Sequence, residues 1–264
     1  MGEDKIRLGG MALANGVLVH GPTAWACAIR SPSGELVVES DYKRFRAAEI
    51  ERPLVRGAAR LAEVMLLLPE VRGRLPQARL PFERPRVLGA MVGSVIAARL
   101  IKTSRLKPFA QELLAGILSL APAALSVRGT DVAAYHGAEH ISIGTYEHGE
   151  PRAREHERCG SHMLGPLVAS SAVGGALASR APARLRTPAR VTAQLGAVAA
   201  STEIFAWMAR NPEHPVSRAL AKPGHELQHR LATAEPTPEQ LEVAEAALAA
   251  CLELERTADG ADHN

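Results

Sequence analysis

The chain has few aromatic residues, few cysteines, and no apolar run long and pure enough to be a clear transmembrane helix. Phe, Trp and Tyr make up 3% of its 264 residues. Its three cysteines, Cys27, Cys159 and Cys251, are far apart and odd in number, which argues against a disulfide framework and indicates a reducing compartment. The first ten residues are charged and carry no apolar segment, so a cleaved signal peptide is not expected.

A large excess of charge of one sign is also lacking. The chain has 31 Lys and Arg against 28 Asp and Glu, a formal net charge of +3, so a nucleic-acid partner is not expected. Small residues are plentiful, including 22 glycines. Small side chains let helices approach closely, which is common in membrane bundles but not restricted to them.

The N-terminal part, residues 1–45, is expected to form a small β element. Short apolar segments at 16–20, 25–30 and 35–39 are separated by turns that contain Gly and Pro. This pattern predicts a hairpin or a three-stranded meander. Residues 46–85 follow as an amphipathic helix and a Pro- and Arg-containing connection.

Residues 86–232 are expected to form a helical core. Its four apolar stretches are 87–101, 113–127, 163–179 and 191–208. Each is shorter or more polar than the roughly 20 apolar residues of a typical spanning helix. If all four spanned a membrane, the basic loops after the first and third would share one side, the cytoplasmic one by their positive charge. The N-terminal part would then lie outside, so partly embedded helices or a soluble helical domain stay open as alternatives.

The last part of the chain is expected to be a helix followed by a tail. Thr237, Pro238 and Gln240 are typical of a helix start with a capping box. We therefore expect a C-terminal helix within 233–256 and a disordered tail at 257–264. The predicted fold class is mainly α, a helical bundle embedded in or associated with a membrane, with a small N-terminal β-hairpin or meander.

The pentapeptide HGAEH, His136 to His140, is the main candidate for chemistry. Histidines four residues apart lie on one face of a helix and can bind one metal ion, although such pairs also occur on ordinary helix surfaces. Glu139 between them could activate a water molecule. His156 or Cys159 could supply a third ligand, and mixed His, Cys and carboxylate sets suit zinc or iron.

Two further candidates come from the C-terminal half. His225, Glu226 and His229 form HELQH, the pattern in which zinc proteases place two ligands and a general base, although a chance match in a chain with ten histidines stays open. Glu203 lies inside the fourth apolar stretch, where a carboxylate is costly unless it is paired or bound to a metal. It is therefore a further candidate ligand.

Several separate segments resemble one known family in order and spacing. They are GGMALANGVLVHGPTAWACAIRSPSGELVVE near the start, AAYHGAEHISIGTYE and EHERCGSH in the middle, and STEIFAW, NP, KPG, LQ and EPTPEQLEVAEAAL toward the end. These segments resemble the YqhQ family, a bacterial family of unknown function described as predicted metal-dependent enzymes. Its members look like integral membrane proteins. The chain departs from the family pattern at Met11, Asn15 and Ile141, where the family has Gln, Glu and Lys.

The resemblance implies a set of polar positions and a location. The matched positions are His136, Glu139, His140, His156, Cys159 and Glu203; the full HELQH string is not matched. The expected protein is a metal-dependent hydrolase at the bacterial cytoplasmic membrane, with zinc or iron as the divalent metal, Glu139 as the base and an unknown substrate. The alternatives are a non-enzymatic membrane scaffold with a structural metal or none, and a zinc protease built on HELQH. A cytoplasmic location and self-association into a homo-oligomer are compatible with the sequence.

Overall fold

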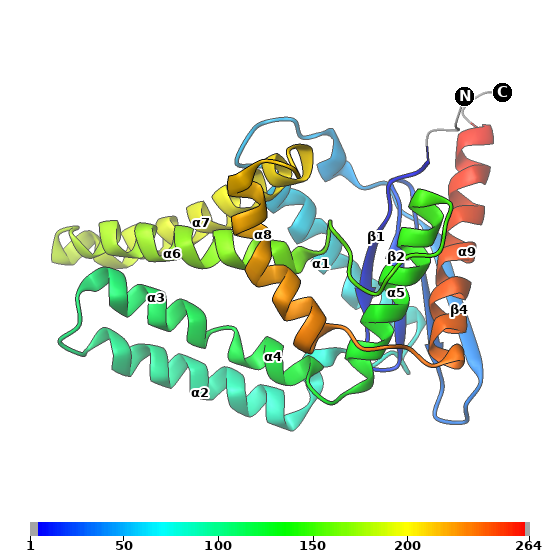
Figure 1. The fold of residues 1–264 in the computed structure, drawn as a ribbon, viewed down its shortest axis with the longest axis horizontal. Coiled ribbons are helices and arrows are strands. Elements are labelled where there is room, and N and C mark those ends of the chain that lie inside the picture. Colours follow the sequence, from blue (N-terminus) through cyan, green and yellow to red (C-terminus); the bar gives the residue numbers. More distant parts are fainter. Residues whose placement is uncertain (1–4, 262–264) are drawn as a thin grey trace.

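The computed structural model describes residues 5–261, with side chains up to residue 258. A small β-sheet enclosed by helices forms one part of the molecule, and long helices extend from it as the other part (Figure 1). The chain is therefore mainly helical with a small N-terminal sheet, as predicted.

The sheet is an antiparallel meander of four strands in sequence order. The strands are β1 (Gly9–Ala12), β2 (Gly16–His20), β3 (Ala24–Arg30) and β4 (Leu36–Tyr42). The last three are the predicted apolar segments. The sequence does not predict β1, because Gly-Gly-Met-Ala has neither β-branched residues nor an apolar alternation.

Both faces of the sheet are covered. Helix α1 (Arg56–Arg74) packs on the face that carries the large residues of β3, namely Trp25, Cys27 and Ile29. Helices α5 (Asp131–His148) and α9 (Pro238–Ala261) pack on the opposite face, against the small residues Ala26 and Ala28. Because small side chains line this second face, α5 and α9 approach the strands closely, and the sheet core lies between the three helices.

Helices α2, α3, α4, α6 and α7 form what we call the helical arm, which extends to the left in Figure 1. Their bounds are Pro85–Lys102, Pro108–Leu118, Ala121–Val127, Leu164–Ser179 and Arg186–Arg210. The predicted stretches 87–101 and 191–208 lie within α2 and α7, 163–179 lies within α6 except for Met163, and 113–127 is divided between α3 and α4. The connections between α2 and α3 and between α6 and α7 carry the basic residues Arg105, Lys107 and Arg184, and both lie at the tip of the arm.

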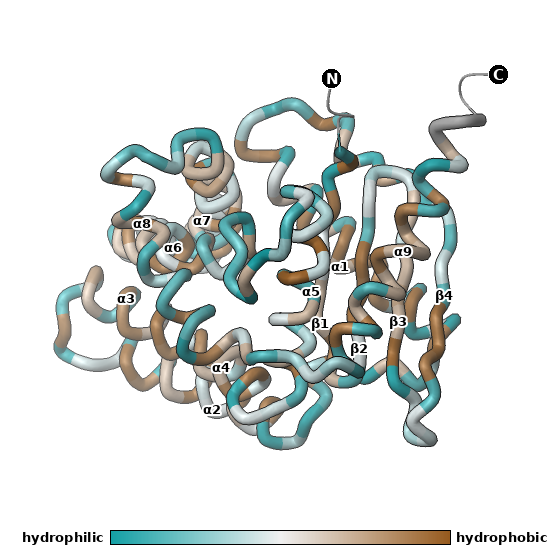
Figure 2. The backbone as a smooth tube through the Cα atoms, turned by 45° about the vertical axis from the view of Figure 1, so that its right-hand side comes forward, coloured by the Kyte–Doolittle hydropathy of each residue, from teal (hydrophilic) through white to brown (hydrophobic). Residues whose placement is uncertain are grey.

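The arm exposes many apolar side chains, and Figure 2 shows that much of its backbone belongs to apolar residues. On α2 alone, six such residues are 46–66% exposed: Leu88, Met91, Val92, Val95, Ile96 and Leu100. The segment Pro108–Val127 is long and apolar enough to cross a membrane, and 17% of its most apolar window is buried. A single segment of this kind is weak evidence for a span, since the core helix of a soluble protein can have the same composition.

The chain returns from the arm through α8 (Pro215–Leu227) and a π-helical turn (Gln228–Ala232). The remaining short elements are 3-10 turns at Arg46–Glu49, Pro81–Glu83, Gly160–Met163 and Ala183–Leu185.

Helix α9 extends to Ala261, beyond the predicted end at residue 256. The buried carboxylate of Glu255 accepts hydrogen bonds from the backbone of Thr23 and Ala24 and from the Thr23 hydroxyl, which holds this end of the helix on the sheet. The predicted disordered tail at 257–264 is therefore wrong for residues 257–261, and residues 262–264 lie outside the described range.

Candidate metal centre

Helix α5 carries the HGAEH segment and is buried on nearly all sides. It ends at Gly149, whose φ of +75° is the left-handed conformation that commonly terminates helices. The segment after the π-helical turn crosses the helix directly at Gly137. A side-chain carbon at Gly137 would lie 2.2 Å from the backbone oxygen of Ala234, so only glycine permits this contact. The helix is thus held firmly between the sheet and the loops that follow it.

His136, His140 and Cys159 are brought together as a group that could hold a metal ion. Each offers one ligand atom, and these atoms all lie within 4.8 Å of one another. The sulfur of Cys159 lies 3.5 Å from Nε2 of His136. Two imidazoles and a thiol are a donor set that suits zinc or iron, and three protein ligands leave the fourth position of a tetrahedron open.

Both histidines are oriented by backbone carbonyl groups. Nδ1 of His136 lies 2.8 Å from the oxygen of Ala232, and Nδ1 of His140 lies 2.6 Å from the oxygen of Arg154. A carbonyl oxygen accepts only, so the Nδ1 atoms donate and the lone pairs are on Nε2. Burial lowers the pKa of His140 to about 2, which keeps its imidazole neutral. Metal-bound histidines in proteins are oriented in the same way by partners outside the ligand set.

Cys159 lies at the start of the 3-10 turn Gly160–Met163. Its sulfur accepts a hydrogen bond from the backbone N–H of Ser161, at 3.5 Å. Burial raises the pKa of the Cys159 thiol, so the uncharged thiol is favoured in the protein alone. A cation beside the sulfur has the opposite effect and favours the thiolate that binds metals.

The carboxylate of Glu139 lies beside the two imidazoles. One of its oxygens is 3.6 Å from Nε2 of His140 and 4.0 Å from Nε2 of His136. Burial raises the pKa of Glu139 to about 7. Strand β1 closes over this side chain, because a side-chain carbon at Gly10 would lie 2.1 Å from the Glu139 carboxylate. The N-terminal sheet thus forms one wall of the centre.

His156 lies next to the group but has other partners. Its Nε2 is 3.1 Å from a carboxylate oxygen of Glu147, and its Nδ1 accepts a hydrogen bond from the backbone N–H of Arg158. The centre of its ring is 5.5 Å from that of His140. With both ring nitrogens engaged, His156 borders the centre and is not one of the three grouped ligands.

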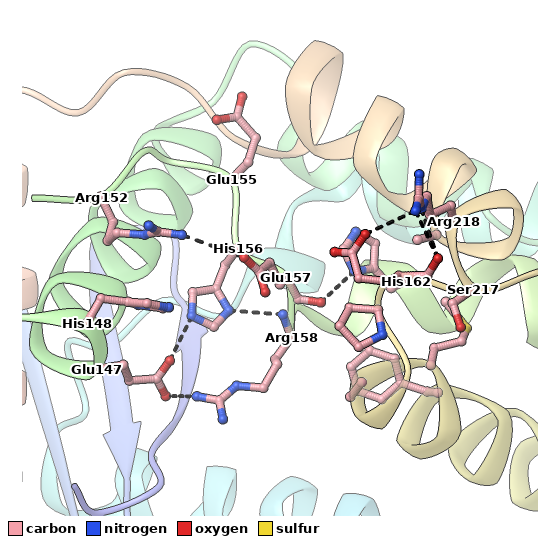
Figure 3. A pocket seen from close by; sticks show the side chains of 16 residues that line it. Glu147, His148, Arg152, Glu155, His156, Glu157, Arg158, His162, Ser217 and Arg218 are labelled. Carbon is pink, nitrogen blue, oxygen red and sulfur yellow. Dashed lines mark hydrogen bonds and ion pairs between the residues drawn. The ribbon is translucent and has the colours of Figure 1, made fainter. Parts of the chain in front are cut away.

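A cavity of about 610 Å³ begins at His156 and extends toward α7 and α8 (Figure 3). Polar side chains line both sides: Glu147 and Arg158 lie beside His156, and Ser217 and Arg218 of α8 lie opposite them. Helix α7 adds the apolar residues Phe205 and Met208. The cavity thus offers partners to a molecule with a polar and an apolar part, although none of the residues His136, Glu139, His140 and Cys159 is among its lining residues.

Glu203 is placed away from this group. Its carboxylate accepts hydrogen bonds from Nε of Arg56 at 2.9 Å and from the backbone N–H of Leu54 at 3.1 Å. The hydrogen bond from Arg56 lowers the pKa of Glu203. The cost of a carboxylate in an apolar stretch is thus offset by an arginine of α1, and this pairing fixes α1 against α7.

The HELQH residues are not brought together as a ligand group either. His229 pairs with Glu155, Glu226 pairs with Arg230, and the rings of His225 and His229 are 6.4 Å apart and stacked. Helix α8 ends at Leu227, so the π-helical turn interrupts the helix in the middle of the motif. A single α-helix through the motif, as the protease pattern requires, is therefore not formed.

Gln228, inside the same motif, is the residue that sequence reasoning missed. It is fully buried, and its side chain accepts a hydrogen bond from the backbone N–H of His156 and donates one to the hydroxyl of Ser161. These contacts hold both ends of the loop that carries Cys159. The signal that could have found it was the LQ pair, which follows the family's order and spacing.

The comparison with known families agrees with the resemblance seen in the sequence. A family model described as "Protein of unknown function (DUF1385)", the YqhQ family, matches residues 116–254, more than half of the chain. The matched region includes His136, Glu139, His140 and Cys159. No curated protein and no solved structure matches the chain.

Proposed function

Because this chain belongs to the DUF1385 family of proteins of unknown function, its chemistry has to be argued from its own residues, and we propose that it is a metal-dependent hydrolase associated with a membrane. The observation that carries the proposal is the group of His136, His140 and Cys159, with their ligand atoms within 4.8 Å of one another and the carboxylate of Glu139 beside them.

The residues present fit a divalent cation, with zinc favoured and iron as the other suitable metal. Both imidazoles have Nδ1 engaged by a backbone carbonyl and Nε2 directed to the group. The thiol, held by the N–H of Ser161, supplies the third donor atom. This set is the kind that binds zinc in proteins, and its orientation by outer partners raises affinity.

When bound, such a cation lowers the pKa of a water molecule and polarises a carbonyl or phosphoryl oxygen. Glu139 would be the proton acceptor in such chemistry, since its carboxylate is buried and lies within 4 Å of both Nε2 atoms. Strand β1 covers the carboxylate at Gly10 and so limits access of bulk water. The substrate would approach from the cavity beside His156, whose polar and apolar lining residues favour an amphipathic molecule.

The helical arm supports association with a membrane. Several of its helices expose apolar side chains, and the segment Pro108–Val127 has the length and composition of a span. Exposed apolar patches larger than a few hundred Å² are uncommon on soluble monomers and mark contact with a membrane or a partner. The bacterial cytoplasmic membrane is the location we propose.

One feature favours a second function, a scaffold with a structural metal. The carboxylate of Glu139 is close enough to the imidazoles to close the tetrahedron as a fourth ligand after a small movement. A closed set of four protein ligands is typical of structural sites, whereas catalytic sites keep one position for water.

Metal analysis of protein purified without a histidine tag tests the proposal. We expect about one equivalent of metal in the wild type, its loss in His136→Ala/His140→Ala, and its retention in His225→Ala/His229→Ala, the matched control. Full metal content in the first double variant would refute the assignment. Glu139→Gln separates the two functions. An enzyme retains metal and loses activity, whereas a structural site with Glu139 as its fourth ligand loses metal affinity and stability.

A further inference from the structure

A second pocket lies beside the π-helical turn and the first turn of α5. It has a volume of about 500 Å³, and we call it the arginine pocket after Arg84, Arg128 and Arg230, which line it. Arg84 directly precedes α2, Arg128 directly follows α4, and Arg230 belongs to the π-helical turn. Three guanidinium groups from three separate elements therefore border one hollow.

The charge of this pocket is positive. Arg230 pairs with Glu226, whereas in the part of the chain that the structure describes no ion pair involves Arg84 or Arg128. Asp131 is the one acidic residue among the described lining residues, so the formal balance of the lining is positive. The first turn of α5 also borders the pocket, and backbone N–H groups there add to its positive potential. Arginine is the residue that best recognises phosphate, because its planar fork donates two parallel hydrogen bonds.

An apolar groove begins beside the arginine pocket. This arm groove has a volume of about 530 Å³ and runs between α2 and α4, with Phe82, Val87, Met91, Val95 and Ala98 among its lining residues. Phe82 and Val87 stand two and three residues from Arg84 in the chain, and Ser126, at the same end of the groove, stands two residues before Arg128. From Val87 to Ala98 the groove follows α2 for about 16 Å, at 1.5 Å per residue.

From this arrangement we propose that the protein binds a membrane phospholipid, with its phosphate in the arginine pocket and an acyl chain in the arm groove. A small anion would use the arginines and leave the groove empty, and an uncharged apolar molecule would leave the arginines without a partner. A phospholipid has a phosphate next to its acyl chains, and the arginine pocket likewise lies next to the apolar arm groove. The arm exposes apolar residues directly beyond Arg84 and Arg128, which would place both at headgroup level in a bilayer.

The proposed site goes beyond the hydrolase, because none of the three grouped metal ligands lines it. It is connected to the metal centre through the π-helical turn, which supplies Arg230 to the pocket and the carbonyl of Ala232 to His136, and through α5, whose first turn borders the pocket. Phospholipid binding can therefore be tested on protein with or without metal.

The test is native mass spectrometry of the full chain in a mild detergent, titrated with dioleoyl phosphatidylglycerol. We expect saturable binding that Arg84→Gln/Arg128→Gln weakens at least tenfold, because two charge-assisted contacts to phosphate are lost. Arg184→Gln/Arg186→Gln removes the same charge at the tip of the arm and is expected to leave binding unchanged. Ala98→Phe fills the groove and is also expected to weaken binding.

Two further probes separate the sources of the phosphate. Glycerol 3-phosphate lacks acyl chains and dioleoylglycerol lacks phosphate, so both are expected to bind at least tenfold more weakly than the phospholipid. Equal binding of glycerol 3-phosphate would overturn the assignment in favour of a soluble phosphate ligand. Equal losses in the pocket variant and the tip variant would also overturn it, since they would show general attraction to anionic lipid. Unfolding midpoints of all variants within a few degrees of the wild type verify that the fold is intact.

Discussion

Replacing Gln228 by methionine would test how the loop that carries Cys159 is held. Methionine has a similar length and is apolar, so the substitution removes hydrogen bonds while it largely preserves volume. The side chain accepts from the N–H of His156 at 2.9 Å, and its amide nitrogen lies 2.8 Å from the hydroxyl of Ser161, 3.3 Å from the oxygen of His156 and 3.3 Å from Nε2 of His162. Because that nitrogen carries two hydrogens, three hydrogen bonds are lost. At about 1 kcal/mol for each hydrogen bond, the free energy of unfolding should fall by about 3 kcal/mol.

The same substitution should weaken metal binding. His156 and Ser161 stand on either side of Cys159, so the sulfur loses its fixed position when both are released. Loss of such outer contacts typically lowers metal affinity by about tenfold to a hundredfold. Urea unfolding and zinc titration against a competing chelator measure the two effects. Gln77→Met, at an exposed position, is the matched control. A loss below about 0.5 kcal/mol together with unchanged zinc affinity would refute the reasoning.

Two other predictions concern buried or paired groups. Glu203→Gln should leave the metal content of the protein unchanged, because the Glu203 carboxylate pairs with Arg56. The metal contents of Glu203→Gln and His140→Ala, measured side by side, test this prediction. A loss of metal in Glu203→Gln would show that Glu203 is a ligand. Burial raises the pKa of Cys27 and of Cys251 to about 12, so at pH 8 neither thiol should react with a disulfide reagent until the protein unfolds. In a Cys159→Ser variant, rapid labelling before unfolding would contradict this prediction.

Local patterns in the sequence predicted the elements that depend on local physics. The strands β2 to β4, the helices of the arm and the start of α9 follow from apolar periodicity, turn residues and the capping residues near Pro238. Strand β1 was missed because its glycines carry no strand signal. Gly10 is required by a tertiary contact, since it makes room for the side chain of Glu139. The end of α9 was missed because Glu255 is bound by residues about 230 positions away.

In the candidate site, too, the sequence predicted the contacts that depend on local spacing and not those that depend on packing. The spacing of His136 and His140 placed them together on one helix, and Cys159 is one of three residues, with His156 and Glu203, that the sequence offered to complete the ligand set. Whether Glu203 faces a metal or an arginine depends on how α1 packs on α7, which no local pattern encodes. The HELQH string illustrates the opposite error, since its spacing is correct for an α-helix but the chain forms a π-helical turn there.

The close contact at Gly10 has a consequence for how this protein can be divided. The match to the family model begins at residue 116, yet the Glu139 carboxylate of the candidate metal centre is covered by strand β1, about a hundred residues before that point. A fragment of residues 116–254 would expose the faces of α5 and α9 that the sheet covers, including Ala138 and Val243. Such a fragment should be prone to aggregation and should lack one wall of its own site. A shortened chain for biochemical work should therefore begin before β1. An insertion between β1 and β2 should affect the candidate metal centre more than the helical arm.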